Sequence, residues 1–133
     1  MNERIAAVVD DNEEDRAQVK ALFPIRDFEE CVEYENEDEF LQTISSGTKV
    51  PAIVFLDLRM STPDAGLEIL RALRSQDELK MIPVVMISSS DAESDVIACY
   101  REGANIYIHK SDEPDEFAKA LATLLDVWTS TGR

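Results

Sequence analysis

The sequence is short of basic residues, and this shortage excludes whole classes of partner. Thirteen lysines and arginines stand against 28 aspartates and glutamates, which gives a formal net charge of −15. Nucleic acids and anionic membrane surfaces both require a basic face on the protein. We therefore expect neither to be a direct partner, whereas a basic protein partner is compatible with this charge.

Cysteine and long apolar runs are also scarce. The two cysteines, Cys31 and Cys99, lie far apart and in no CxxC pattern, so we interpret them as small apolar residues in a reducing compartment. No secretory leader is recognisable, and no apolar stretch approaches the roughly 20 residues that span a bilayer. These features predict a cytoplasmic protein with no membrane association.

Short β-branched runs alternate with segments of helical period along the 133 residues, a length that suits a single domain over 1–133. Such alternation predicts a doubly wound α/β fold, in which helices cover both faces of a parallel sheet. The expected strands are Ile5–Val9, Cys31–Tyr34, Ala52–Leu56, Ile82–Ile87 and Ile106–Ile108.

Helix signals lie between these runs. Asn36 with Glu39, and Ser90 with Glu93, have the spacing of capping boxes, and Pro114 suits a first helical turn. The apolar stripe expected for the fourth helix consists of Val96, Ile97 and Tyr100.

Polar residues stand where four of the five runs end. Asp10 and Asp11 follow the first run, Asp57 the third, Ser88 the fourth and Lys110 the fifth. The carboxyl ends of parallel strands meet at one edge of the sheet, where ligands bind in open α/β folds. Taken singly, each residue has an ordinary explanation, such as a turn, a helix cap or a polar loop. The combination at successive strand ends predicts one shared site.

The residue types at this edge predict a Mg²⁺-dependent phosphoryl-accepting site. Three carboxylates repel one another, and a hard cation with oxygen ligands relieves that repulsion. We expect Asp11 and Asp57 to be direct ligands and Asp10 to act through water. An aspartate can also attack phosphorus, so Asp57 is the expected acceptor, with Lys110 and Ser88 binding phosphoryl oxygens.

These segments resemble the receiver domain of bacterial two-component response regulators. The resemblance covers about residues 4–128 and is carried by four stretches. They are Val8-Val9-Asp10-Asp11-Asn12, Ile53–Leu56 into Asp57, Met86-Ile87-Ser88, and Tyr107-Ile108-His109-Lys110.

The resemblance implies a flavodoxin-like fold with strand order 2-1-3-4-5 and a signalling role. The protein would not be an enzyme beyond its own phosphorylation and dephosphorylation. Asp57 would take a phosphoryl group from a histidine kinase or phosphotransfer protein. The backbone carbonyl of Arg59 would join Asp10 and Asp11 around Mg²⁺, and Ser88 and Tyr107 would form the switch pair.

Two segments depart from the family pattern. The segment Ser61-Thr62-Pro63-Asp64-Ala65-Gly66 is shifted and lengthened relative to the family's proline and Asp-Gly pair. The family's Lys-Pro is here Lys110-Ser111. A non-prolyl cis bond costs about 2.5–4 kcal/mol, so we expect this bond to be trans.

The expected output is protein binding, because only Thr129–Arg133 follow the last predicted helix. The face formed by the fourth helix, fifth strand and fifth helix is the expected surface for a downstream protein or a homodimer. The Ala104-Asn105 lead into Tyr107 also resembles short receivers paired with phytochrome-type kinases.

Two other functions fit the same topology. A pseudo-receiver adaptor would keep the fold and signal without phosphate, and the Lys110-Ser111 departure favours it. A flavodoxin-like cofactor binder would need a Ser/Thr/Gly-rich loop after the first strand. This chain has Asp10-Asp11-Asn12-Glu13-Glu14-Asp15 there, and such acidity repels a phosphate.

Overall fold

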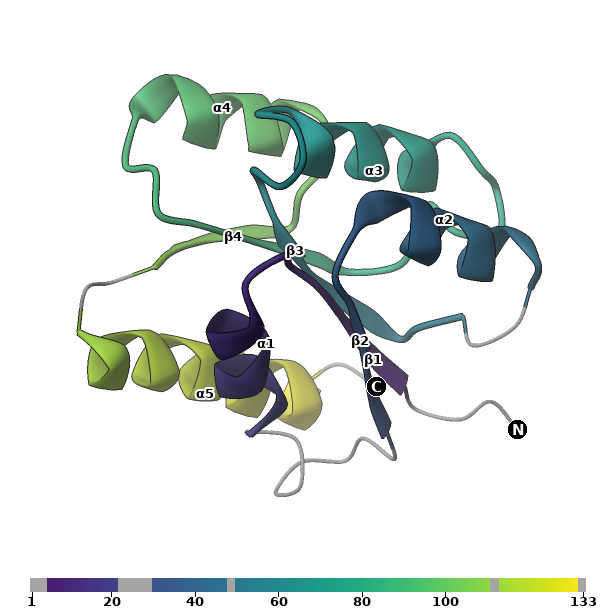
Figure 1. Ribbon diagram of the computed structural model, residues 1–133. Coiled ribbons are helices and arrows are strands. Elements are labelled where there is room, and N and C mark those ends of the chain that lie inside the picture. The colour runs from purple at the N-terminus through teal and green to yellow at the C-terminus, as the bar shows by residue number, and fades with distance from the viewer. Residues whose placement is uncertain (1–4, 22–29, 48–49, 111–112, 132–133) are drawn as a thin grey trace.

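The computed structural model describes residues 5–21, 30–47, 50–110 and 113–131, and these form one parallel sheet with helices on both faces (Figure 1). The five strands run in the order β2-β1-β3-β4-β5, which confirms the predicted fold class and strand order. The strands are β1 (Ile5–Val9), β2 (Glu30–Tyr34), β3 (Ile53–Asp57), β4 (Val84–Ser88) and β5 (Ile106–His109).

The helices form two outer layers. In Figure 1, α1 and α5 lie on one face of the sheet and α2, α3 and α4 on the other. Their bounds are α1 (Glu13–Lys20), α2 (Glu37–Ser45), α3 (Ala65–Arg74), α4 (Glu93–Arg101) and α5 (Pro114–Thr131). Within the described ranges, no helix combines the length and the apolar character needed to cross a membrane.

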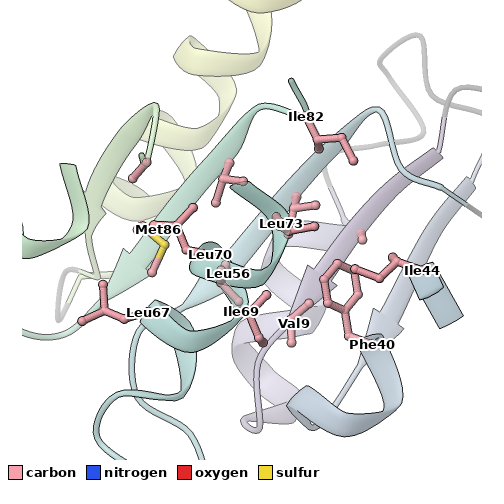
Figure 2. Packing of buried hydrophobic residues seen from close by; sticks show 14 of the residues in the cluster. Val9, Phe40, Ile44, Leu56, Leu67, Ile69, Leu70, Leu73, Ile82 and Met86 are labelled. Carbon is pink, nitrogen blue, oxygen red and sulfur yellow. The ribbon is translucent and has the colours of Figure 1, made fainter. Parts of the chain in front are cut away.

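Alternation along the strands divides the core into two clusters. Ala6 and Val8 of β1 point to the cluster beneath α1 and α5, whereas Ala7 and Val9 point to the cluster beneath α2, α3 and α4. Figure 2 shows the second cluster, in which helix side chains pack on strand residues. Its labelled members are Val9, Phe40, Ile44, Leu56, Leu67, Ile69, Leu70, Leu73, Ile82 and Met86. A sheet buried on both faces explains why its central strands read as unbroken apolar runs.

Two predicted helix starts are confirmed and one is wrong. The Asn36 side chain accepts the backbone N–H of Glu39 at 2.8 Å, and α5 begins at Pro114. At α4 the cap position is instead Ala92, without a side-chain cap. The Ser90 hydroxyl accepts the Ala92 N–H and so shapes the preceding loop rather than the helix end.

The apolar stripe predicted for α4 is also wrong. Cys99 is the residue that α4 buries completely, whereas the side chains of Ile97 and Tyr100 are 45% and 47% exposed. The helix lies beside the edge strand β5 and buries only a narrow face, so a small residue suffices there. Two large apolar side chains are consequently left on the outer surface of α4.

Candidate functional site

Three carboxylates meet at the carboxyl edge of the sheet. Oxygen atoms of Asp10, Asp11 and Asp57 all lie within 4.8 Å of one another. Asp57 is the last residue of β3, and Asp10 and Asp11 follow β1 directly, so neighbouring strands bring them together. Asp10 and Asp57 are buried and Asp11 is exposed, which leaves the cluster open on one side.

Burial and mutual repulsion make two of these carboxylates unusually basic. Burial, reinforced by the negative charge of Asp10, raises the pKa of Asp57 to about 7. Burial also raises the pKa of Asp10. Two contacts oppose this rise: the Asn12 N–H donates to Asp10 Oδ1 at 2.9 Å, and the Lys110 ammonium lies nearby. The pocket therefore carries an excess of negative charge, and a divalent cation with oxygen ligands fits its donor set.

The Lys110 ammonium supplies the positive charge that the pocket does have. Its Nζ lies 3.0 Å from Asp10 Oδ2, 2.7 Å from Asp15 Oδ2 and 3.5 Å from Asp57 Oδ1. Burial alone would lower the pKa of Lys110, but these carboxylates outweigh burial and raise it. Lys110 is therefore a fixed cation that contacts the expected phosphoacceptor.

Ser88 and Tyr107 are joined through the connection between β4 and α4. Ser88 is buried at the end of β4, and its hydroxyl accepts the Ser90 N–H at 3.0 Å. The Tyr107 hydroxyl donates to the Ser90 carbonyl at 2.7 Å, and burial raises the pKa of this phenol. The two expected switch residues thus contact the same loop residue.

A second network connects the loop after β3 to the start of α4. The Arg59 guanidinium forms an ion pair with the carboxylate of Asp95, and the Ser90 hydroxyl donates to the same carboxylate. Asp95 lies in the first turn of α4, whereas Arg59 stands two residues after Asp57. The segment that follows the acceptor is therefore bonded to the helix that carries Ile97 and Tyr100.

The lengthened loop after β3 ends in a close backbone contact. The Gly66 N–H donates to the Leu58 carbonyl at 2.9 Å, and a Cβ atom at Gly66 would lie 2.4 Å from the Asp57 carbonyl oxygen. Only glycine allows α3 to begin so close to the acceptor strand. The shifted sequence thus still brings a glycine beneath Asp57.

Comparison with known proteins assigns the family. The model of the response regulator receiver domain matches residues 6–122. The chain belongs to the response regulator receiver domain family. The predicted family is confirmed, and the flavodoxin-like cofactor binder considered from the sequence is not supported by this match.

A cyanobacterial response regulator is among the similar proteins. The response regulator Rcp1 of Synechocystis is 35% identical over 81 residues, which are 61% of this chain and 54% of Rcp1, so the match spans about half of that relative. The crystal structure of Mn²⁺-bound Rcp1 has a TM-score of 0.86 at 26% identity, covering 98% of this chain and 97% of that one.

A phosphorylated relative has the same fold. The phosphorylated cyanobacterial phytochrome response regulator RcpA has a TM-score of 0.89 at 25% identity, and the match covers 99% of this receiver and 98% of RcpA. The expected resemblance to phytochrome-associated receivers therefore agrees with the similar proteins found.

The structure brings most of the predicted residues together and adds two more. Asp15, which contacts Lys110, and Asp95, which contacts Arg59, were not among the predicted site residues. Asp15 stands three residues after the helix cap Asn12, which could have indicated a side chain near the sheet edge. The Lys110–Ser111 bond falls outside the described residues, and the Arg59 carbonyl as a metal ligand stays a prediction.

Proposed function

We propose that this receiver is a phosphorylation switch in which Asp57 accepts a phosphoryl group from a histidine kinase or a histidine phosphotransfer protein, with Mg²⁺ as cofactor. The observation that carries the proposal is the placement of the buried Asp57 carboxylate, 3.5 Å from the Lys110 ammonium and within 4.8 Å of two other acids. We further infer a cytoplasmic location, because that is where its phosphodonors would act.

The proposed transfer uses groups already at the edge of the sheet. A carboxylate oxygen of Asp57 attacks phosphorus and forms an O–P bond, while the P–N bond to the donor histidine breaks and its electron pair stays on the imidazole nitrogen. Lys110 neutralises one phosphoryl oxygen, and the Ser88 hydroxyl donates to another. Such positioning and charge neutralisation account for most of the catalysis of phosphoryl transfer.

The acidic cluster would hold the cofactor. Asp11 and Asp57 would be direct ligands with the Arg59 carbonyl, and Asp10 would act through water. A bound Mg²⁺ would neutralise negative charge shared by the cluster and the incoming phosphoryl group. Asp11 is exposed, so a cation can reach the cluster from solvent.

The proposed output passes through Ser88 and Tyr107 to the surface of α4, β5 and α5. If the Ser88 side chain turns to donate to the phosphoryl group, its oxygen moves relative to the Ser90 N–H that it accepts, and the Ser90 carbonyl in turn accepts from Tyr107. Ile97 and Tyr100 expose apolar surface on this face, which suits a downstream protein or a second copy of the chain. Phosphorylation would thus alter the face that binds the partner.

Incubation with acetyl phosphate and Mg²⁺ tests the proposal. Intact-mass measurement should show the addition of one phosphoryl group, which Asp57→Asn abolishes. Asp64→Asn is a matched control, because Asp64 is an exposed aspartate in the following loop without a side-chain cap bond. If the native protein gains no phosphoryl group and binds no BeF₃⁻, the protein is a pseudo-receiver and the proposal is wrong.

A further inference from the structure

The three carboxylates around Lys110 do not share its ammonium equally. The shortest contact, 2.7 Å, is to Asp15, and the next, 3.0 Å, is to Asp10. The oxygen of Asp57 is 3.5 Å away and forms an ion pair with Lys110 without an N–H···O bond of ordinary length. In this state Lys110 is hydrogen-bonded to two residues that do not take the phosphoryl group.

Asp15 and Lys110 are both held on rigid elements. The Asp15 N–H donates to the Asn12 side chain at 3.0 Å, which places Asp15 in the first turn of α1, where the helix dipole favours a negative charge. The Lys110 N–H donates to the Ser88 carbonyl at 2.7 Å, which continues the β4–β5 pairing. The side chains of Lys110 and Asp15 are only 15% and 26% exposed, so water competes weakly for their contact.

Phosphorylation changes what Lys110 must bind. The new phosphoryl oxygens on Asp57 are stronger acceptors than the carboxylate oxygen that they replace, and they carry more negative charge. Two of the three N–H donors of Lys110 are bonded to Asp15 and Asp10, so the phosphoryl oxygens would take the third and compete with Asp15 for the position and charge of Nζ.

We propose that Asp15 is a positioning residue that competes with the phosphoryl group for Lys110 and thereby slows the phosphorylation of Asp57. The inference depends on the proposed function of Asp57, because it concerns the rate of that reaction. A residue at the start of α1 would then limit the rate of phosphorylation, and this residue is not one of those that would hold the cofactor.

Asp15→Asn tests this directly, because it keeps the shape and an accepting oxygen but removes the charge. The rate constant for phosphorylation by acetyl phosphate should rise about threefold, the size expected for a partly exposed ion pair. The affinity for BeF₃⁻ should rise by a similar factor. The Mg²⁺ concentration at half-saturation should stay the same. A general disturbance of the pocket would change it.

Two further variants separate competition for Lys110 from simple loss of negative charge. Glu14→Gln removes the same charge from the neighbouring exposed position and should leave the rate constant unchanged. In a Lys110→Met background, Asp15→Asn should bring no gain in rate, because the contested donor is absent.

The outcomes distinguish this inference from the proposed function. If the native protein is phosphorylated but Asp15→Asn reacts at the same rate or more slowly, the inference is wrong and the proposed function stands. Equal acceleration by Glu14→Gln would also overturn it. If the native protein takes up no phosphoryl group at all, the proposed function itself fails.

Discussion

The carboxyl ends of the parallel strands form one edge of the sheet and their amino ends the opposite edge, and the two edges differ in how their charged groups are bonded. At the carboxyl edge, buried Asp10 and Asp57 repel each other, and burial raises the pKa of both. At the amino edge, the Arg74 guanidinium donates to the carbonyls of Lys80, Ile82 and Gly103 at 2.8–3.0 Å. The difference indicates that the charged group at the amino edge is satisfied by several acceptors, whereas the carboxyl edge, where we propose the reaction, retains unfavourable charge.

Removing the guanidinium from the amino edge should have the largest effect on stability. Arg74→Met removes this donor from the three carbonyls. Asn105 Oδ1 also loses its bond from Arg74 at 2.9 Å but still accepts the Val84 N–H at 2.8 Å. We expect the free energy of unfolding to fall by about 2–3 kcal/mol, measured by urea denaturation.

Arg71→Met is the matched control for that change. Arg71 lies on the same helix and forms an ion pair with Glu102 in which its side chain is 53% exposed, so its loss should cost less than about 0.5 kcal/mol. Equal losses in the two variants would show that the amino edge is not held by Arg74.

Neutralising the acceptor Asp57 should change the free energy of unfolding in the opposite direction and by a smaller amount. Asp57→Asn removes a buried charge, so in EDTA the free energy of unfolding should rise by about 1–2 kcal/mol at pH 8. Because the pKa of Asp57 is raised to about 7 in the folded state, the native protein gains stability relative to the variant as the pH falls below 7. The gain should be complete near pH 4, where Asp57 is protonated in the unfolded chain too.

A series of urea melts from pH 4 to pH 8 measures this difference. Asp64→Asn, an exposed aspartate replaced in the same way, should give a curve parallel to that of the native protein. A destabilised Asp57→Asn variant at pH 8 would mean that its contact with Lys110 outweighs the repulsion.

The cation should give the smallest of the three effects. Mg²⁺ at three times its dissociation constant should stabilise the protein by about 0.8 kcal/mol, because it binds the native state and offsets the charge of the acidic cluster. Asp11→Ala should abolish the shift in melting temperature, and since Asp11 is exposed the variant should still fold. An unchanged melt of the native protein in millimolar Mg²⁺ would contradict the metal assignment.

The fold was predictable because burial on both faces leaves a plain signal. Ile5–Val9 and the apolar runs into Asp57 and Ser88 are typical of strands in a covered parallel sheet, and the order of polar residues at their ends predicted the site. Strand ends differed by one or two residues, since Asp57 and Ser88 still pair within β3 and β4.

The contacts around the site were less predictable because they join side chains that lie far apart in sequence. The link between Asp15 and Lys110 spans 95 residues, and no local pattern encodes it. Ser90 resembled a helix cap by spacing alone, but its hydroxyl bonds to Asp95 and to the Ala92 N–H instead. Periodicity likewise failed for α4, where the position beside an edge strand determines which residues are buried.

The Tyr100 hydroxyl affects whether another polypeptide strand can pair with the sheet. It accepts the Tyr107 N–H at 3.0 Å, and Tyr107 lies on β5, the last strand of the sheet. Unpaired groups on an outermost strand are a template for adding a foreign strand, which leads to aggregation or peptide capture. Any strand that joins β5 at this point must first displace the Tyr100 side chain of α4. The position of that helix therefore hinders strand addition at the open side of the sheet.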